Sequence, residues 1–459
     1  STAPWYVEVD GKPMQPRREP AQFFVDWSRK RMATLEALTE VTAAQKTELL
    51  QPWREAETFW QGKLAAAHRT VTVTGQVMDA TARQPLKSAK DARVAAAGPL
   101  DPRGKVHIPI GKPDSVDTLK TFVEAEGCFS PGFGSYGIYF WLWDAQARKL
   151  TAPTMDGVPC EHGLKEGVEL IPWSRWKVGE AEVTSEVCET RRASPKGDVF
   201  VVAARVQVIN RGSKDAALAL YAALRPLGPA GGDVAKIAVS DDGGALLVND
   251  HPALVSASKP QGVGVSDADT IGDFALRGGL PAAMNAADNV AASCSGALRF
   301  ELKLKPGEKR TLAFVCPVLP GRRAAAHEWK DLKHDAMTDV APLNQPAGGV
   351  LQPDPGLDYY RALSVDELFA EASHLWQSAI GSSRIQMPDQ RWDEAWRVIL
   401  SHASLCMNEG APDVAVINYN VFNRDGIYVV NMLQKSGQFA LAARALDYFL
   451  KHPFNGRAF

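Results

Sequence analysis

The spacing of hydrophobic positions changes along the chain. Near the start it is helical: VTAAQKTELLQPWREAETFWQGKLAAA places Trp53, Trp60 and Leu64 near one face of a helix. Pro52 is expected to end or kink that helix, because proline lacks the amide donor and its ring clashes with the preceding turn. The pattern predicts an irregular and helical N-terminal arm over residues 1–68 that serves for packing.

From residue 69 onward, apolar positions alternate with polar ones, which is the period of a half-buried β-strand. The stretch 69–127 contains RTVTVTGQVMD and GKVHIPI and predicts a small β-sandwich module. Longer alternations follow in GIYFWLWD, EAEVTSEVCE, DVFVVAARVQVINRG, AALALYAALRP and GALRFELKLKPGEKRTLAFVCPV. Strands separated by turn residues, with no helical stretch between them, predict a large antiparallel β-sandwich over 128–320. Pro306 and Gly307 predict a hairpin turn inside it.

The strand GIYFWLWD carries four aromatic residues, Tyr139, Phe140, Trp141 and Trp143. Such a cluster can form a platform on which a sugar stacks. Alternate residues of a strand point to opposite faces, however, so core packing is the favoured interpretation.

After a Pro- and Gly-bearing linker over 321–365, the period becomes helical again. Residues 366–459 contain four helical patterns, VDELFAEASHLWQSAIG, PDQRWDEAWRVILSHASLCMNEG, RDGIYVVNMLQKSG and QFALAARALDYFLKH. Gly437 separates the last two and predicts a helical hairpin with a minimal turn. No fifth helical pattern follows before the chain ends.

Composition narrows the function classes. The 459 residues are 45% hydrophobic and 23% charged, with a net charge of −2, as expected for a soluble globular protein. This balance gives no reason to expect a nucleic-acid partner, and no apolar run is long enough to span a membrane. The first residues lack the pattern of a signal peptide, and the chain starts at Ser rather than Met, so we expect a processed, secreted or periplasmic protein.

Metal and cofactor chemistry has no support in the sequence. The six cysteines are widely spaced without a CxxC or Cys/His cluster, so neither a metal nor a cofactor is expected. Disulfides and buried thiols remain open alternatives. His162 and His374 stand without partners and are interpreted as structural. Glu371, Glu394 and Glu409 lie on predicted helix faces or ends, and we expect them to be solvated.

The stretch NYNVFNRDG differs from an ordinary loop in its side chains. Arg424 supplies a fixed fork of donors, and Asp425 accepts hydroxyl hydrogens through charge-assisted bonds. Neighbouring residues at a helix start diverge by about 100°, so the two side chains are expected to reach different sugar hydroxyls. Phe422 can cover a sugar ring, and Asn420 and Asn423 can add hydrogen bonds. The structural alternative is that Asp425 is an N-cap, Arg424 is exposed and Phe422 packs on the helix.

A β-sandwich, a linker, and helices that open with an aromatic-x-Arg-Asp motif together resemble the six-hairpin glycosidases. These are glucoamylase-like and debranching-type glycoside hydrolases with a β-supersandwich before an (α/α)6 barrel. The resemblance places Tyr419 at the motif's tyrosine and Phe422 at its tryptophan. It gives Arg424 and Asp425 the role of gripping sugar hydroxyls, or gives Asp425 that of a catalytic acid. A weaker resemblance, carried by VTGQVMDATARQPLKSA and GPLDPRGKVHIPI, links 69–127 to the carboxypeptidase regulatory-like module.

The resemblance implies a fold that is β first and α second, with an (α/α)6 barrel that we expect to be incomplete in this chain. It implies an exo-acting, inverting glycosidase on α-linked glucose-type oligosaccharides or polysaccharides. The general acid and base are then expected beyond residue 459, on a remaining C-terminal portion of the barrel. Two alternatives stay open: a non-catalytic carbohydrate-binding or scaffold protein, and a polysaccharide lyase.

Overall fold

Contacts between residues divide the chain into two units, 1–85 and 86–459, which are described separately. The structure is a computed structural model. It describes residues 8–9, 12–13, 18–39, 41–66, 98–282, 284–320, 352–380, 383–413, 415–416, 421 and 423–451.

The first unit is built around a pair of long helices. Its elements are β1 (Glu8–Val9), β2 (Lys12–Pro13), α1 (Arg18–Glu36) and α2 (Ala43–Ala66). Phe24 stacks on Trp60 with ring centroids 4.5 Å apart, and Trp27 meets Trp53 at 5.2 Å, so the two helices run antiparallel. The expectation was that Pro52 would end or kink this helix, and the helix does not end there but continues through Pro52 to Ala66.

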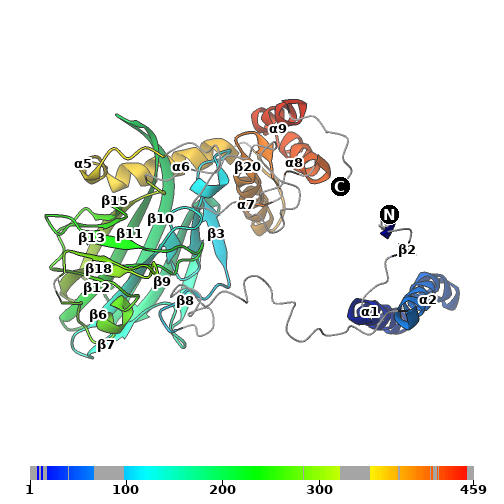
Figure 1. The fold of residues 1–459 in the computed structure, drawn as a ribbon, viewed down its shortest axis with the longest axis horizontal. Helices are drawn as coiled ribbons and strands as arrows, with labels where there is room; N and C mark the ends of the chain where they lie inside the picture. The colour runs from blue at the N-terminus through cyan, green and yellow to red at the C-terminus, as the bar shows by residue number, and fades with distance from the viewer. Residues whose placement is uncertain are drawn as a thin grey trace. The chain divides into compact units, whose positions relative to one another are not determined.

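The second unit contains a sandwich of two antiparallel sheets (Figure 1). The nine-stranded sheet has the order β17-β13-β14-β15-β19-β11-β10-β9-β8, and the eight-stranded sheet has the order β16-β18-β12-β6-β5-β4-β3, with β7 paired to β6. The strands are β3 (His107–Ile110), β4 (Thr121–Glu124), β5 (Phe129–Ser130), β6 (Gly137–Asp144), β7 (Lys149–Thr151), β8 (Cys160–Lys165), β9 (Glu169–Val178), β10 (Ala181–Ser194), β11 (Gly197–Asn210), β12 (Ala216–Arg225), β13 (Lys236–Val239), β14 (Ala245–Val248), β15 (His251–Ser256), β16 (Gly262–Ser266), β17 (Ala286–Asp288), β18 (Ser295–Leu304) and β19 (Lys309–Pro317).

The long predicted strands are present, but one predicted pairing is wrong. The turn at Pro306 and Gly307 does not close a hairpin, because β18 pairs with β12 and β16 whereas β19 pairs with β11 and β15. The chain therefore crosses from one sheet to the other at this turn. Gly307 has φ 75°, a conformation that glycine adopts without strain.

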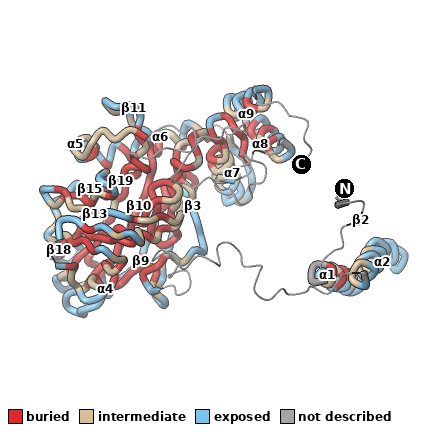
Figure 2. The backbone as a smooth tube through the Cα atoms, in the orientation of Figure 1, coloured by how far each residue is buried: buried red, intermediate tan, exposed pale blue. Residues whose placement is uncertain are grey.

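The sandwich core explains the aromatic strand. Figure 2 shows the buried backbone concentrated in the two sheets of the sandwich. Phe140 lies between the sheets, 5.4 Å from Phe314, whereas Tyr139, Trp141 and Trp143 belong to a second buried cluster on the other face of β6. The short helix α4 (Ile271–Ala275) contributes to that cluster. Core packing of the four aromatic residues is confirmed, on both faces of the strand.

Helix α6 (Val365–Ile380) lies on the nine-stranded sheet, where it contacts β9, β10, β11 and β19. Its apolar face, which includes Leu368, Phe369 and Trp376, is buried there. A partly buried polar contact adds to this packing, since Gln377 donates to Glu169 of β9 at 2.7 Å. The short helix α5 (Leu357–Arg361) precedes α6 and contacts β15 and β19.

The predicted (α/α)6 barrel is wrong for the described part of the chain. Eight α-helices occur there, two of them in residues 1–85, which is too few for six helix pairs. The remaining helices are α7 (Arg391–Leu405), α8 (Asn423–Lys435) and α9 (Phe439–Lys451), with the hairpin β20 (Met407–Asn408) and β21 (Ala411–Pro412) between α7 and α8. The physical reason for the difference is that the apolar face of α6 packs on a β-sheet and is therefore not available to pair with another helix. The chain is thus mostly β, with a small helical part in which α8 and α9 form the predicted hairpin.

Two predicted segments lie partly outside the described residues. Of the module predicted over 69–127, residues 98–127 are described, and they supply β3, β4 and the 3-10 helix η1 (Asp117–Leu119). Strands β3 and β4 are part of the eight-stranded sheet. Of the predicted linker 321–365, the described portion starts at Gln352, which is buried.

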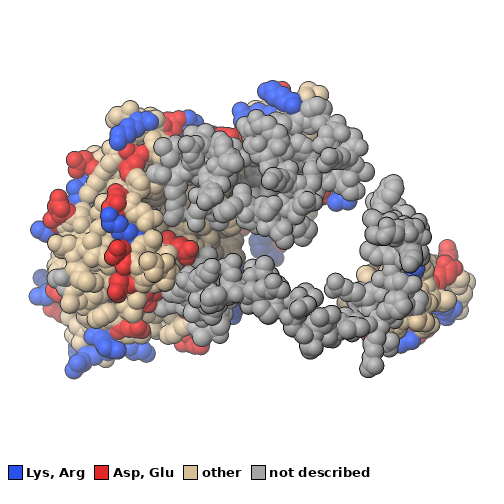
Figure 3. All heavy atoms as spheres, in the orientation of Figure 1, with Lys and Arg blue, Asp and Glu red and all other residues tan. Residues whose placement is uncertain are grey.

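The near-neutral net charge corresponds to a surface on which both signs of charge are mixed. On the visible face of the sandwich, acidic and basic side chains are interspersed (Figure 3). All six cysteines are free, which resolves the choice between disulfides and thiols in favour of thiols. No described helix is long and apolar enough to cross a membrane.

Candidate functional site

The structure places only part of the predicted sugar site. Arg424 and Asp425 lie in the first turn of α8, and Asn423 is the first residue of that helix. The side chains of Tyr419, Asn420 and Phe422 lie outside the described residues, as does that of Asn423. The assignment of these six residues to a sugar site stays a prediction.

Arg424 and Asp425 face each other rather than diverging. The Arg424 Nη2 atom lies 3.4 Å from Asp425 Oδ2 and 3.5 Å from Oδ1. The side chains are 76% and 31% exposed, so solvent reaches both. An exposed ion pair of this kind is worth about 1 kcal/mol or less, so a polar ligand can replace it at low cost. Because Asp425 lies inside the helix, it is not the N-cap of the structural alternative.

The start of α8 is held by a close contact that depends on a glycine. A Cβ atom on Gly426 would lie 2.5 Å from Phe449 of α9 and 3.1 Å from Pro412 of β21. Any larger residue would push these elements apart. The RDG sequence therefore combines two polar residues with a packing residue that sets the position of the helix start.

The hairpin β20–β21 supports α8 and is anchored to the sandwich. Lys120, fully buried before β4, donates through Nζ to Asn408 Oδ1 at 2.6 Å and to the Met407 carbonyl at 3.2 Å, and also to the Leu405 carbonyl. Asn408 in turn donates to Asp413 at 2.9 Å. This buried network fixes the hairpin against the sheet. The sequence TLKTF shows no feature that predicts it.

Two other buried carboxyl groups, those of Glu124 and Glu189, have pKa values well above the usual range. Burial raises the pKa of Glu124 to about 7 and that of Glu189 to about 8. Glu189, on β10, accepts a hydrogen bond from the Thr121 amide at 3.0 Å, and its Oε1 atom has no hydrogen-bond partner among the described residues. The relative exposure of both residues is only 1–2%. They are held protonated close to neutral pH but are covered by protein.

The acidic residues predicted to be solvated lie on helices or in a turn. Glu371 forms an ion pair with Arg192 and is on α6, whereas Glu394 is in the first turn of α7. Glu409 occupies the turn between β20 and β21, with φ 51°. Among the described residues, no group of three or more His, Cys, Asp and Glu side chains is placed to hold a metal ion.

Comparison with solved structures yields similarities of limited extent. A bacterial glucoamylase complexed with acarbose aligns at 13% identity with TM-score 0.48, over 75% of this chain and 50% of that chain. A protein described as a kojibiose phosphorylase from the human microbiome aligns at 10% identity with TM-score 0.30, over 64% and 34%. A glycosyl hydrolase of the GH92 family aligns at 9% identity with TM-score 0.21, over 67% and 39%.

All three names denote carbohydrate-active enzymes, and the chain spans half the length of the glucoamylase. No family model matches the sequence, and no curated protein matches it. With TM-scores below 0.5 and identities of 13% or less, these similarities do not assign the chain to a family.

Proposed function

We propose that the chain belongs to a carbohydrate-active enzyme in which Arg424 and Asp425 hold one sugar unit at the start of α8. The observation that carries the proposal is the solvent-reachable pair of opposite charges, 3.4 Å apart, on a helix start fixed by the Gly426 contact. A guanidinium donates to sugar oxygens, and a carboxylate accepts from sugar hydroxyls. The pair therefore matches the mixed donor and acceptor character of a sugar.

Binding would open the ion pair. In the free protein each charged group satisfies part of its hydrogen-bonding capacity with the other. A sugar hydroxyl inserted between them accepts from Arg424 and donates to Asp425, so both groups keep a charged hydrogen bond. The aromatic ring of Phe422, two residues before Arg424, would cover the apolar face of the sugar.

The more specific proposal is an exo-acting glycosidase that inverts the configuration at α-linked glucose-type units. The sequence motif from Tyr419 to Asp425 supports it through its resemblance to the six-hairpin glycosidases. Inverting hydrolysis needs two carboxyl groups roughly 6.5–9.5 Å apart on opposite sides of the reacting carbon. Arg424 and Asp425 are assigned binding and orientation in this reaction, not proton transfer.

Calorimetric titration with maltotriose tests the proposal. The substitution Asp425→Asn should weaken binding by about 10-fold or more, because a hydrogen bond to a charged group contributes about 1.5–3 kcal/mol. The matched control is Asp389→Asn, since Asp389 and Arg391 form a comparable exposed ion pair at the start of α7. Equal affinity of Asp425→Asn and the unaltered chain for every gluco-oligosaccharide tried would remove the pair from the site.

A further inference from the structure

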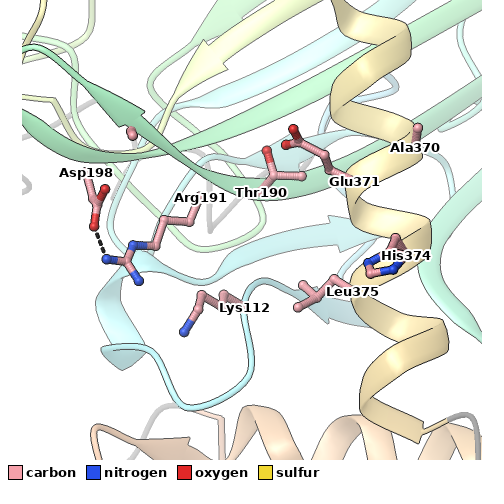
Figure 4. Close-up of a pocket in the computed structure, with 9 residues that line it drawn as sticks. Lys112, Thr190, Arg191, Asp198, Ala370, Glu371, His374 and Leu375 are labelled. Carbon is pink, nitrogen blue, oxygen red and sulfur yellow. Dashed lines mark hydrogen bonds and ion pairs between the residues drawn. The ribbon is translucent and has the colours of Figure 1, made fainter.

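A cleft lies between the sandwich and α6, and none of the residues that line it belongs to α8. The cavity measures about 760 Å³ and is lined by residues of β10, β11, α6 and the segment after β3 (Figure 4). An adjoining hollow of about 430 Å³ shares Lys112, Arg191 and Asp198 with it. Small-molecule sites usually have volumes of about 300–1,000 Å³, so the cleft is large enough for a sugar-sized ligand.

Lys112 occupies the junction of the two hollows. It follows β3, is half-buried, and its ammonium group has no hydrogen bond or ion pair within the described residues. Burial lowers the pKa of Lys112, and the nearby positive charge of Arg191 lowers it further, whereas Asp114 acts in the opposite direction. A half-buried cation without a partner is costly, and a bound anion would offset that cost.

Most of the acidic groups that line the cleft are already engaged. Asp198 pairs with Arg191, and Glu371 pairs with Arg192. Asp114 pairs with Arg444 of α9 and accepts from the Gly410 amide at 2.6 Å. Glu409 lies exposed at the edge of the smaller hollow. Asp114 and Glu409 act on Lys112 electrostatically, but neither forms an ion pair with it among the described residues.

The opposite wall is supplied by α6 and is preformed. Figure 4 shows His374 and Leu375 projecting from α6 into the cleft, with Lys112 and Arg191 entering from other elements. The helix is fixed beneath this wall, since Ser373 accepts from Lys165 at 3.0 Å and also bonds to Glu169. Leu375 offers an apolar surface beside the charged groups.

We propose that this cleft binds a small ligand that carries an oxyanion, either a carboxylate or a phosphate, with Lys112 as its counter-ion. The anion lies between Lys112 and the outer edge of the Arg191 guanidinium, whose other edge is occupied by Asp198. The rest of the ligand lies against Leu375 and His374. A compact ammonium group can donate hydrogen bonds to either anion, so a carboxylate and a phosphate are both compatible with the site.

Calorimetric titration tests the proposal. The full chain is titrated separately with inorganic phosphate, with glucuronate and with neutral glucose. At least one of the two anions should bind, and which one binds shows whether the oxyanion is a phosphate or a carboxylate. Glucose should not bind at Lys112. Lys112→Gln should weaken that binding at least tenfold. Lys236→Gln is the matched control, because Lys236 is exposed and pairs with Asp250 on the surface.

Two further variants serve as controls. One distinguishes loss of the binding site from loss of the fold, and the other distinguishes this cleft from the proposed site at α8. Ala370→Trp, at an exposed position of α6 that lines the cleft, should block binding while Lys112 is kept. Asp425→Asn should leave anion binding unchanged, so a failure of the α8 proposal does not affect this result. The proposal is overturned if neither anion binds, or if folded Lys112→Gln and Ala370→Trp bind the anion as well as the unaltered chain.

Discussion

The Nζ atom of Lys120 lies 2.6 Å from Oδ1 of Asn408, although 288 residues separate them in the chain. Both side chains are buried, and the contact joins the sandwich to the β20–β21 hairpin. That hairpin carries Glu409 at the edge of the cleft and packs Pro412 against the start of α8. One buried lysine thus holds a hairpin that borders the hollow next to the cleft and the start of α8.

Replacing Lys120 should therefore destabilise the second unit. Lys120→Ala leaves Asn408 and two backbone carbonyls without their donor, and breaking a buried charged network costs about 3–5 kcal/mol. Urea unfolding should show this loss in the free energy of unfolding. Lys303→Ala, at an exposed strand position, should change it by less than about 0.5 kcal/mol. Equal stability of the two variants would show that the network does not anchor the hairpin.

Gly426 should tolerate no larger residue. In Gly426→Ala the new methyl group meets Phe449 and Pro412, and overpacking of this kind costs about 1–3 kcal/mol. Gly62, inside α2, has open space around its Cβ position, so Gly62→Ala should instead stabilise its helix by about 0.5–1 kcal/mol. Thermal unfolding of the two variants should shift in opposite directions. A Gly426→Ala variant as stable as the unaltered chain contradicts the close contact.

Arg225 should be essential for the sandwich. It is 2% exposed and binds Asp101 at 2.7 Å and Asp269 at 3.0 Å, so Arg225→Ala removes the buried cation that pairs with these two buried carboxylates. We expect a loss of about 3–5 kcal/mol in denaturant unfolding. Arg211→Ala removes an exposed partner of Glu182 and should cost about 1 kcal/mol or less. The interpretation is wrong if both variants lose the same amount.

Stability should fall with rising pH because of Glu189. Its pKa is about 8 in the folded chain and about 4.3 in an unfolded one, so the folded state binds the proton more tightly. The stabilisation is complete below about pH 4.3 and is lost as pH rises towards 8. The melting temperature of Glu189→Gln should decline less over this range than that of exposed Glu161→Gln. Identical slopes for the two variants would place the titrating group elsewhere.

Local patterns predicted the elements better than their partners. The strands around GIYFWLWD and DVFVVAARVQVINRG and the helices α6, α8 and α9 follow from alternation, helical spacing and turn residues, which act within a few positions. The pairing of β18 and β19 with different sheets depends on strands far away in the sequence. The barrel prediction is wrong because helical spacing does not distinguish a helix that packs on a helix from one that packs on a sheet.

Local sequence patterns were likewise insufficient to show the contacts at the two proposed sites. The motif around Arg424 and Asp425 was visible in the sequence because its residue types are unusual for a loop. The mutual contact of the two side chains was not, since rotamers are set by the surroundings. Lys112 and Lys120 show no distinctive local pattern. Their significance comes from Arg191 and Asn408, which the fold brings close from distant positions.

A crystal structure of the chain with maltotriose would test the central claim most directly. The account predicts sugar oxygens within about 3.2 Å of both the Arg424 guanidinium and the Asp425 carboxylate, with the direct contact between these side chains opened. A bound sugar elsewhere on the molecule, with Arg424 and Asp425 still paired at 3.4 Å, would contradict it.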